Sequence, residues 1–135
     1  MNGGQIDWRE LFLSADGRLP RTPFLIGCAI LIAATALYEA LVGPIGHWLT
    51  GLIVYPVVLY GGVCVVSKRL HDRGRSGWWA ALIVFAAAVV WPHPAGFLDF
   101  LLMLVLIWAA IELGVMEGEQ GANRFGPNPL RPLSA

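Results

Sequence analysis

Four apolar runs divide the chain, and their lengths limit what it can fold into. The runs cover about residues 24–42, 49–66, 77–91 and 98–115. As helices rising about 1.5 Å per residue, the first, second and fourth would extend roughly 27–29 Å, close to the ~30 Å hydrocarbon core of a bilayer. The third would reach only about 22 Å, which is short for a full crossing. The runs therefore predict an all-α integral membrane protein.

The composition agrees with a membrane protein and excludes other classes. Of the 135 residues, 57% are hydrophobic and 13% are charged, whereas about a quarter are charged in an average soluble domain. The net charge is zero, so the basic surface typical of nucleic-acid-binding proteins is missing. Cys28 and Cys64 both lie inside apolar runs, which favours buried thiols over a disulfide. We predict no nucleic-acid partner, no metal and no cofactor.

The nine lysines and arginines fall into three segments: before the first run, between the second and third, and after the fourth. They are Arg9, Arg18, Arg21, Lys68, Arg69, Arg73, Arg75, Arg124 and Arg131. With four spans all nine lie on one face, as the positive-inside rule requires. A re-entrant third run would instead move the last two to the outside. We therefore predict a four-transmembrane-helix bundle with both termini in the cytoplasm.

Two segments flank the membrane domain of residues 24–115. In residues 1–23, charged and large apolar residues alternate, which predicts a short interfacial helix on the inner leaflet. The alternating residues are Ile6, Asp7, Trp8, Arg9, Glu10, Leu11, Phe12 and Leu13. Residues 116–135 are rich in Gly and Pro and predict a coil tail.

The segment SKRLHDRGRSGWW, residues 67–79, joins the second and third runs. In it, Gly74 is suited to a left-handed helix end and Ser76 to an N-cap of the third helix. Its cations could be a topology signal that contacts lipid head groups. Alternatively, Asp72 could pair with Arg69, three positions away, or His71 and Asp72 could form a general acid–base pair.

Ionisable residues near the run ends need an explanation, since charge inside a bilayer is costly. Glu112 lies about one turn from the inner end of the fourth run, and we expect Lys68, Arg69 or Arg21 as its partner. Alternatively, it could form one wall of a polar pocket with residues 69–79 (RLHDRGRSGWW).

At the outer side, Asp99 suits the first turn of a helix, and Glu39, His47 and His93 lie nearby. A metal site there is conceivable, but the spacing of these residues matches no ligand motif.

Three motifs resemble a bacterial inner-membrane family known as domain of unknown function 805. They are RLHDRGRSGWW (69–79), GRLPRTPF (17–24) and GANRFGPNP (121–129). One departure is Pro20, where the family more often has a small polar residue. The resemblance implies a multi-pass location in the bacterial inner membrane and a fold, but no activity.

All three motifs fall on the predicted cytoplasmic side, so we expect them to form one polar cap. Arg–Asp bridges would hold it together, and the remaining arginine donors could bind a phosphate or carboxylate. The predicted cap or ligand residues are Arg18, Arg21, Arg69, His71, Asp72, Arg73, Ser76, Glu112, Asn123 and Arg124.

Three functions are compatible with such a cap. We favour a non-enzymatic protein that binds a lipid head group, an anion or a partner protein, with membrane lipids and a second copy as possible partners. A transporter or channel subunit would need Glu39 or Glu112 to face a path. An interfacial enzyme acting on a phosphorylated lipid would use His71 and Asp72.

Overall fold

The structure is a computed structural model that describes residues 7–91 and 94–130. These residues form helices joined by short segments, and they contain no β-strand beyond one isolated bridge between Asn123 and Gly126. The elements are α1 (Trp8–Leu13), α2 (Arg21–Leu41), α3 (Pro44–Asp72), α4 (Trp79–Val90), α5 (Phe97–Ala109) and the π-helix η1 (Ala110–Val115).

The first helix, α1, confirms that the N-terminal segment contains a short helix. Asp7 caps it, since its Oδ1 accepts hydrogen bonds from the amides of Arg9 and Glu10 at 3.1 and 3.2 Å. Lys68 of α3 lies at its other end and donates through Nζ to the carbonyls of Glu10 and Leu11. Those carbonyls belong to the last turn, which has no partners within the helix.

The third helix runs beyond its predicted end. The second apolar run ends near residue 66, but α3 continues to Asp72 and includes half of the charged segment. Gly74 then ends the helix at a φ of +75°, as expected from the sequence. The amides of Gly74 and Arg75 donate to the carbonyls of His71 and Leu70 at 3.0 and 2.8 Å, the pattern of a Schellman motif.

Three helices are long and apolar enough to cross a membrane: α2, α3, and α5 together with η1. The fourth apolar helix, α4, has 12 residues and extends only about 18 Å at 1.5 Å per residue. The all-helical membrane fold is thus confirmed, while the number of complete crossings stays a prediction.

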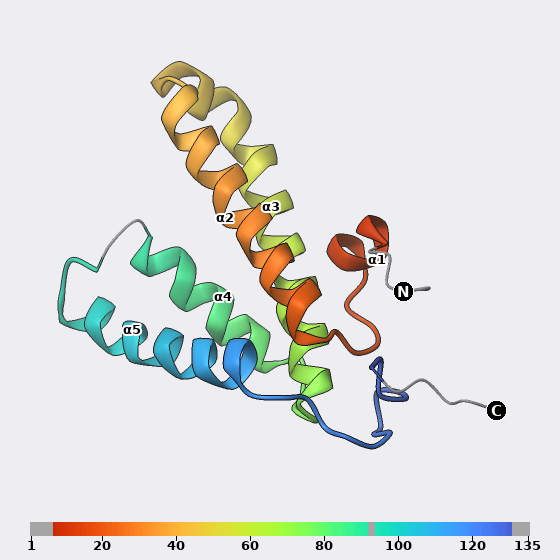
Figure 1. Cartoon of the computed structure of the whole chain (residues 1–135). Helices are drawn as coiled ribbons and strands as arrows, with labels where there is room; N and C mark the ends of the chain where they lie inside the picture. Colours follow the sequence, from red (N-terminus) through yellow and green to blue (C-terminus); the bar gives the residue numbers. More distant parts are fainter. Residues whose placement is uncertain (1–6, 92–93, 131–135) are drawn as a thin grey trace.

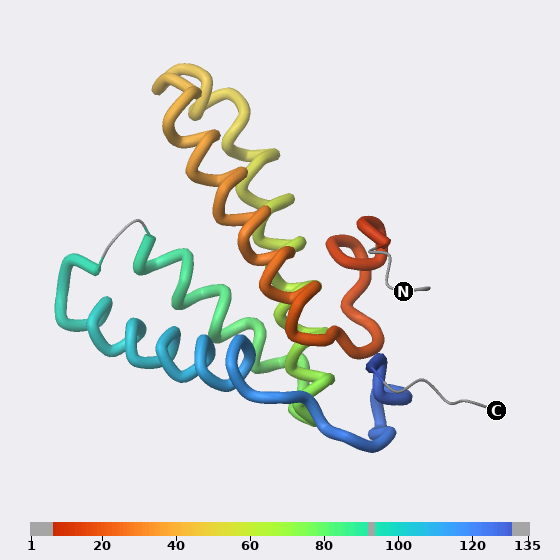
Figure 2. The backbone as a smooth tube through the Cα atoms, in the orientation of Figure 1, coloured from red at the N-terminus to blue at the C-terminus, as the bar shows by residue number. Residues whose placement is uncertain are grey.

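The helices form two hairpins, α2–α3 and α4–α5, that diverge from a common end (Figure 1). The backbone tube shows α1 beside α3 and the C-terminal tail beside this common end (Figure 2). Helix α3 packs against α4 and η1 packs against α2, and these contacts hold the hairpins together. Helices α2, α3, α4 and α5 therefore do not pack into one closed bundle. Apolar helix faces gain little by associating in lipid, because the acyl chains are as apolar as their side chains.

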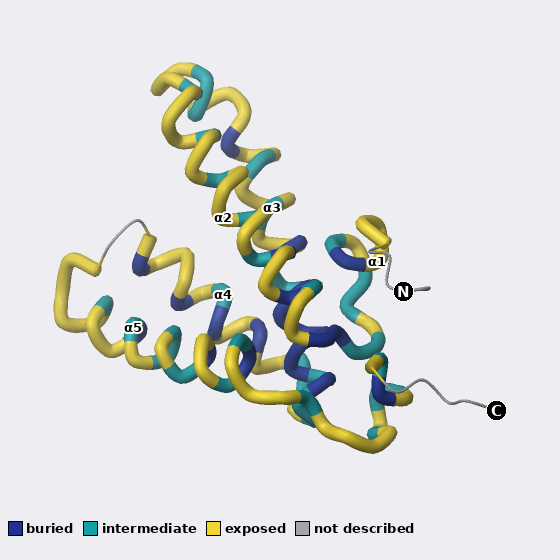
Figure 3. The backbone as a smooth tube through the Cα atoms, viewed as in Figure 1, coloured by how far each residue is buried: buried dark blue, intermediate teal, exposed yellow. Residues whose placement is uncertain are grey.

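The buried residues gather where the hairpins meet (Figure 3). One cluster joins side chains of every helix, including Leu11, Phe24, Leu70, Ile83 and Leu113. A smaller cluster of Ala86, Val90 and Leu102 lies within the α4–α5 hairpin. The principal core therefore lies directly beside the polar residues of the common end.

Candidate functional site: a polar cap

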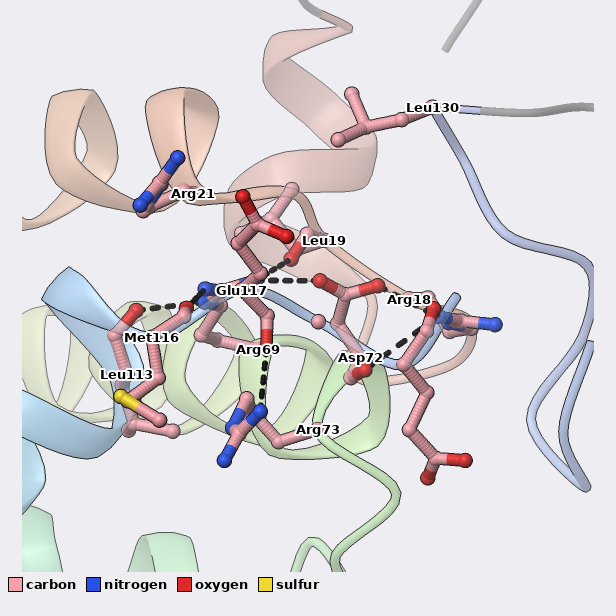
Figure 4. A network of polar contacts seen from close by, with 12 residues as sticks. Arg18, Leu19, Arg21, Arg69, Asp72, Arg73, Leu113, Met116, Glu117 and Leu130 are labelled. Atoms are coloured by element: carbon pink, nitrogen blue, oxygen red, sulfur yellow. Dashed lines mark hydrogen bonds and ion pairs between the residues drawn. The ribbon is translucent and has the colours of Figure 1, made fainter. Parts of the chain in front are cut away.

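The polar cap consists of segments 14–21, 68–77 and 112–130, and Asp72 lies at its centre. The carboxylate is at the end of α3 and the residue is only 3% exposed. Its Oδ1 accepts a hydrogen bond from Arg18 Nε at 3.0 Å, and its Oδ2 accepts one from Arg69 Nη1 (Figure 4). Two charge-assisted bonds offset part of the cost of removing water from a buried carboxylate. The Arg69–Asp72 ion pair considered from the sequence is present.

Arg69, which is fully buried, joins three segments. Its Nε donates to the Leu113 carbonyl at 2.6 Å, its Nη2 to Met116 at 2.7 Å and its Nη1 to Leu19 at 3.2 Å. Leu113 and Met116 lie at the end of η1, where carbonyls lack helical partners and the helix dipole is negative. A planar guanidinium can satisfy several of them at once.

Arg18 binds backbone carbonyls of the C-terminal tail in the same way. Its Nη1 donates to the carbonyls of Gly121 and Gly126 at 2.7 and 3.3 Å. Its Nη2 donates to the carbonyls of Glu119 and Asp72 at 2.6 and 3.4 Å. Together with the Nε bond to Asp72, these contacts use all five N–H groups of the side chain. Arg18 is therefore fully committed to shaping the cap.

His71 and Asn123 fix the tail against the segment that precedes α2. The ring Nδ1 of His71 donates to the Gly17 carbonyl at 2.8 Å, and the ring stacks on Phe125 with centroids 3.8 Å apart. Asn123 Nδ2 donates to the His71 carbonyl at 2.9 Å. Within the described residues, His71 and Asp72 bind different partners, since adjacent residues on a helix point about 100° apart. They do not form a His–Asp dyad.

Glu112 does lie in the cap, but its predicted partners are wrong. Its Oε1 accepts hydrogen bonds from Arg73 Nη2 at 3.0 Å and Arg75 Nε at 2.8 Å. Of the expected partners, Lys68 binds α1 and Arg69 binds Asp72 and the end of η1. Arg21 donates to the Val115 carbonyl at 2.7 Å. Glu112 belongs to the π-helical segment, whose wider turn changes the direction in which its side chains point.

Two predicted site residues lie apart from the Asp72 network. Ser76 Oγ accepts a hydrogen bond from the Trp78 amide at 3.3 Å, but the N-cap of α4 is Trp78 rather than Ser76. The guanidinium of Arg124 lies 4.6 Å from the centre of the Phe125 ring. Neither side chain contacts Asp72 within the described part of the chain.

The predicted site residues did not include Lys68 or Gly118, and Gly74 was predicted as a helix end but not as a contact of the tail. A Cβ on Gly118 would lie 2.0 Å from Asp72 Oδ2, and one on Gly74 would lie 1.4 Å from Glu119 Oε1. Gly118 stands in a glycine-rich tail, where it gave no signal distinct from its neighbours. The tail therefore needs glycine at residue 118 because its backbone passes directly over the central carboxylate.

A polar cavity of about 200 Å³ opens beside the network. The residues that line it are Arg21, Arg69, Asp72, Glu117, Gly118, Gln120, Asn128 and Leu130. Arg69 and Asp72 are already bonded to each other. Arg21 differs, because its Nε and Nη2 have no hydrogen-bond partner among the described residues. This guanidinium has the largest unused donor capacity in the cavity wall.

At the other end of the α2–α3 hairpin, a second polar group joins α2 to α3. Glu39 Oε1 accepts a hydrogen bond from the Tyr55 hydroxyl, and Glu39 Oε2 lies 3.5 Å from His47 Nε2. Asp99 is in the first turn of α5, as predicted, and accepts from the Ala95 amide at 2.9 Å. The described residues hold no group of three or more His, Cys, Asp and Glu suited to a metal. His93 lies outside the described residues.

Apolar helices with a buried Arg–Asp network at one end define a small helical membrane protein whose polar cap joins its two hairpins. Comparison with known proteins identifies the family. The profile of the protein family of unknown function DUF805 matches residues 12–127, and the chain belongs to this family.

Two relatives come from Escherichia coli K12. The uncharacterized protein YiiR is 31% identical over 129 residues, covering 87% of each chain. The inner membrane protein YhaH is 35% identical over 65 residues, which are 48% of this chain and 40% of YhaH. No solved structure matches the chain.

Proposed function

We propose that this protein is a non-enzymatic component of the bacterial inner membrane that binds the phosphate of a lipid head group at its polar cap. The observation that carries the proposal is the cavity beside Arg21. It combines a guanidinium that has unused donors with a volume of about 200 Å³. Guanidinium groups bind phosphate through parallel charge-assisted hydrogen bonds.

The other cap arginines are poorer candidates. Arg18 and Arg69 donate through all three of their nitrogens to protein acceptors, and Arg73 does so to Glu112 and the Glu117 carbonyl. Arg75 and Arg124 do not line the cavity. Arg21 begins α2, and its one bond joins it to Val115 at the end of η1. Arg21 and Val115 each lie at one end of a candidate membrane span. A guanidinium at this position in the chain would lie at the depth of the lipid phosphates.

The proposal includes a topology with four crossings and the cap in the cytoplasm, as the positive-inside rule favours. A thiol introduced at Arg124 should then be shielded from a membrane-impermeant maleimide in intact cells. A thiol at Gly43, between α2 and α3, should be labelled, and a Cβ there meets no atom within 4 Å. Labelling of the Arg124 thiol in intact cells would overturn the topology.

Binding can be tested by native mass spectrometry of the protein purified in mild detergent with added phosphatidylglycerol. Arg21→Gln should lower the fraction of protein that retains a phospholipid by roughly tenfold, the expected loss of one charge-assisted contact. Arg124→Gln removes a cation from the tail that does not line the cavity, so it should retain lipid like the parent protein. Equal retention by all three proteins would contradict the proposal.

The two alternative functions have weaker support in the geometry. An interfacial enzyme would need His71 and Asp72 available, but the first stacks on Phe125 and the second is held by two arginines. A transporter would need Glu39 or Glu112 to face a path, and both accept hydrogen bonds from neighbouring side chains.

A further inference from the structure

The cavity has two opposite charges that are not neutralised by close partners. Arg69 and Asp72 form an ion pair with each other, and Arg18 also binds Asp72. The remaining charges in the wall are the Arg21 guanidinium and the Glu117 carboxylate. They form no ion pair with each other in the described structure, although they line the same cavity. Its net charge is therefore balanced, with one available cation and one available anion.

Glu117 is held beside the cavity by its own segment. Gln120 Nε2 donates to Glu117 Oε2 at 3.2 Å and to the Gly118 carbonyl at 3.4 Å. Asn128 in turn fixes Gln120, since its Nδ2 donates to the Gln120 carbonyl at 2.8 Å. Glu117 Oε1 has no hydrogen-bond partner among the described residues. One carboxylate oxygen is thus available to a ligand, while the other is fixed by the tail.

This charge pattern excludes some ligands in favour of others. A ligand with only negative charge, such as a phosphate monoester, would be attracted by Arg21 but repelled by Glu117. A ligand with a phosphodiester and an ammonium group could satisfy both side chains at once. Such a ligand carries no net charge, so its binding leaves the net charge of the cavity unchanged. An uncompensated charge would be costly here, because the cavity lies next to a buried ion pair.

We infer that the cavity selects a zwitterionic, amine-bearing phospholipid head group, with its phosphate on Arg21 and its ammonium on Glu117. The inference rests on the proposed function, since it assigns the chemical class of the lipid that the same cavity holds. Glu117 determines the specificity of the site, whereas Arg21 supplies the affinity for phosphate.

The test is a competition between two lipids with identical acyl chains. Purified protein in mild detergent is mixed with equimolar phosphatidylethanolamine and phosphatidylglycerol, and native mass spectrometry counts each retained lipid. The parent protein should retain the ethanolamine lipid in roughly threefold preference, the expected effect of one partly exposed ion pair. Glu117→Gln should bring the ratio close to one without lowering the total lipid retained.

Glu119→Gln is the matched control. Glu119 is another exposed carboxylate of the tail, but it does not line the cavity and its Oε1 accepts from Asn123 at 3.4 Å. This variant should keep the preference of the parent protein. Because Glu117 is exposed and its backbone carbonyl contact with Arg73 is unaffected, Glu117→Gln should melt at the temperature of the parent protein.

The possible failures are distinguishable. Retention of both lipids in equal amounts by the parent protein, with retention still dependent on Arg21, would overturn the head-group inference and leave the proposed function intact. A preference for the ethanolamine lipid that persists in Glu117→Gln would also overturn the head-group inference and leave the proposed function intact. Retention that does not depend on Arg21 would overturn both. If Arg21→Gln melts well below Arg124→Gln, Arg21→Met replaces it, since it keeps an unbranched apolar stem but removes the charge. Unchanged lipid retention in that folded variant would count against both.

Discussion

The two halves of α3 have opposite patterns of burial. In the half that begins at Pro44, large apolar side chains are exposed, and Leu52 is 85% exposed. From Cys64 to Leu70 every residue is buried, and this stretch includes Lys68 and Arg69 at 2% and 0% exposure. One continuous helix therefore presents its apolar residues outward and encloses its charges.

The difference shows that the two halves are stabilised by different interactions. The first half lies in a hairpin whose outer surface is apolar and suited to contact with lipid, where side chains need no partners within the chain. The second half is held by hydrogen bonds from side chains to carbonyls that helix ends leave unpaired. Stability should consequently depend on the polar cap far more than on the exposed apolar faces.

Replacing Asp72 by Ala should have the largest effect. The change removes the acceptor shared by Arg18 and Arg69 and leaves two buried guanidinium groups without their carboxylate. Breaking a buried ion pair from one side typically costs about 3–5 kcal/mol of unfolding free energy. Thermal melting in detergent, followed by circular dichroism, should show a large decrease. Asp16→Ala, at an exposed residue between α1 and α2, is the control, and equal melting of the two variants would contradict the central role of Asp72.

Replacing Arg69 by Lys should have the next largest effect, although the charge is kept. An ammonium group cannot reach the carbonyls of Leu113, Met116 and Leu19 together, as the guanidinium does. Leaving two or more buried carbonyls unpaired should cost roughly 2–4 kcal/mol of unfolding free energy. The same melting experiment with Arg124→Lys, at an exposed residue, should show almost no change. A parent-like melting temperature for Arg69→Lys would mean that charge alone holds the cap.

A methyl group at Gly118 tests how closely the tail fits the α3 end. Its Cβ would approach Asp72 Oδ2 to 2.0 Å, so the tail or the carboxylate must move. We expect Gly118→Ala to lower the unfolding free energy by about 1–3 kcal/mol, as for other overpacked positions. Gly121→Ala adds the same methyl group where no atom lies within 4 Å. Identical melting of the two variants would show that the tail is not seated on Asp72.

The sequence predicted the positions of the helices well and their arrangement poorly. Apolar runs and glycine positions carry local information, so the helices and the left-handed Gly74 could be predicted. The divergence of the hairpins could not, because the same apolar faces would suit either lipid or a neighbouring helix. The extension of α3 to Asp72 was missed for a related reason. Charged residues after an apolar run resemble a loop unless the acceptors that will bind them are known.

The hydrogen-bond partners of the cap residues could not be predicted from the sequence either. Arg69 binds mainly backbone carbonyls, and a carbonyl acceptor has no signature in the identity of its residue. The pairing of Glu112 with Arg73 and Arg75 depends on the π-helical geometry of η1, which no motif in the chain indicated. Opposite charges in three separated segments suggested that the segments could meet. Which residues pair with which could be seen only in the three-dimensional structure.

The smallest effect is expected from Leu52→Ala in the first half of α3. Leu52 is 85% exposed, so truncating its side chain leaves no cavity inside the protein. We expect a change of at most about 0.5 kcal/mol in unfolding free energy, as for surface positions in general. The same substitution at Leu70, which is fully buried beside Arg69, should cost about 2–5 kcal/mol. If Leu52→Ala instead melted as low as Leu70→Ala, its side chain would have to contact protein, and the first half of α3 would be an interface between copies rather than a lipid-facing surface.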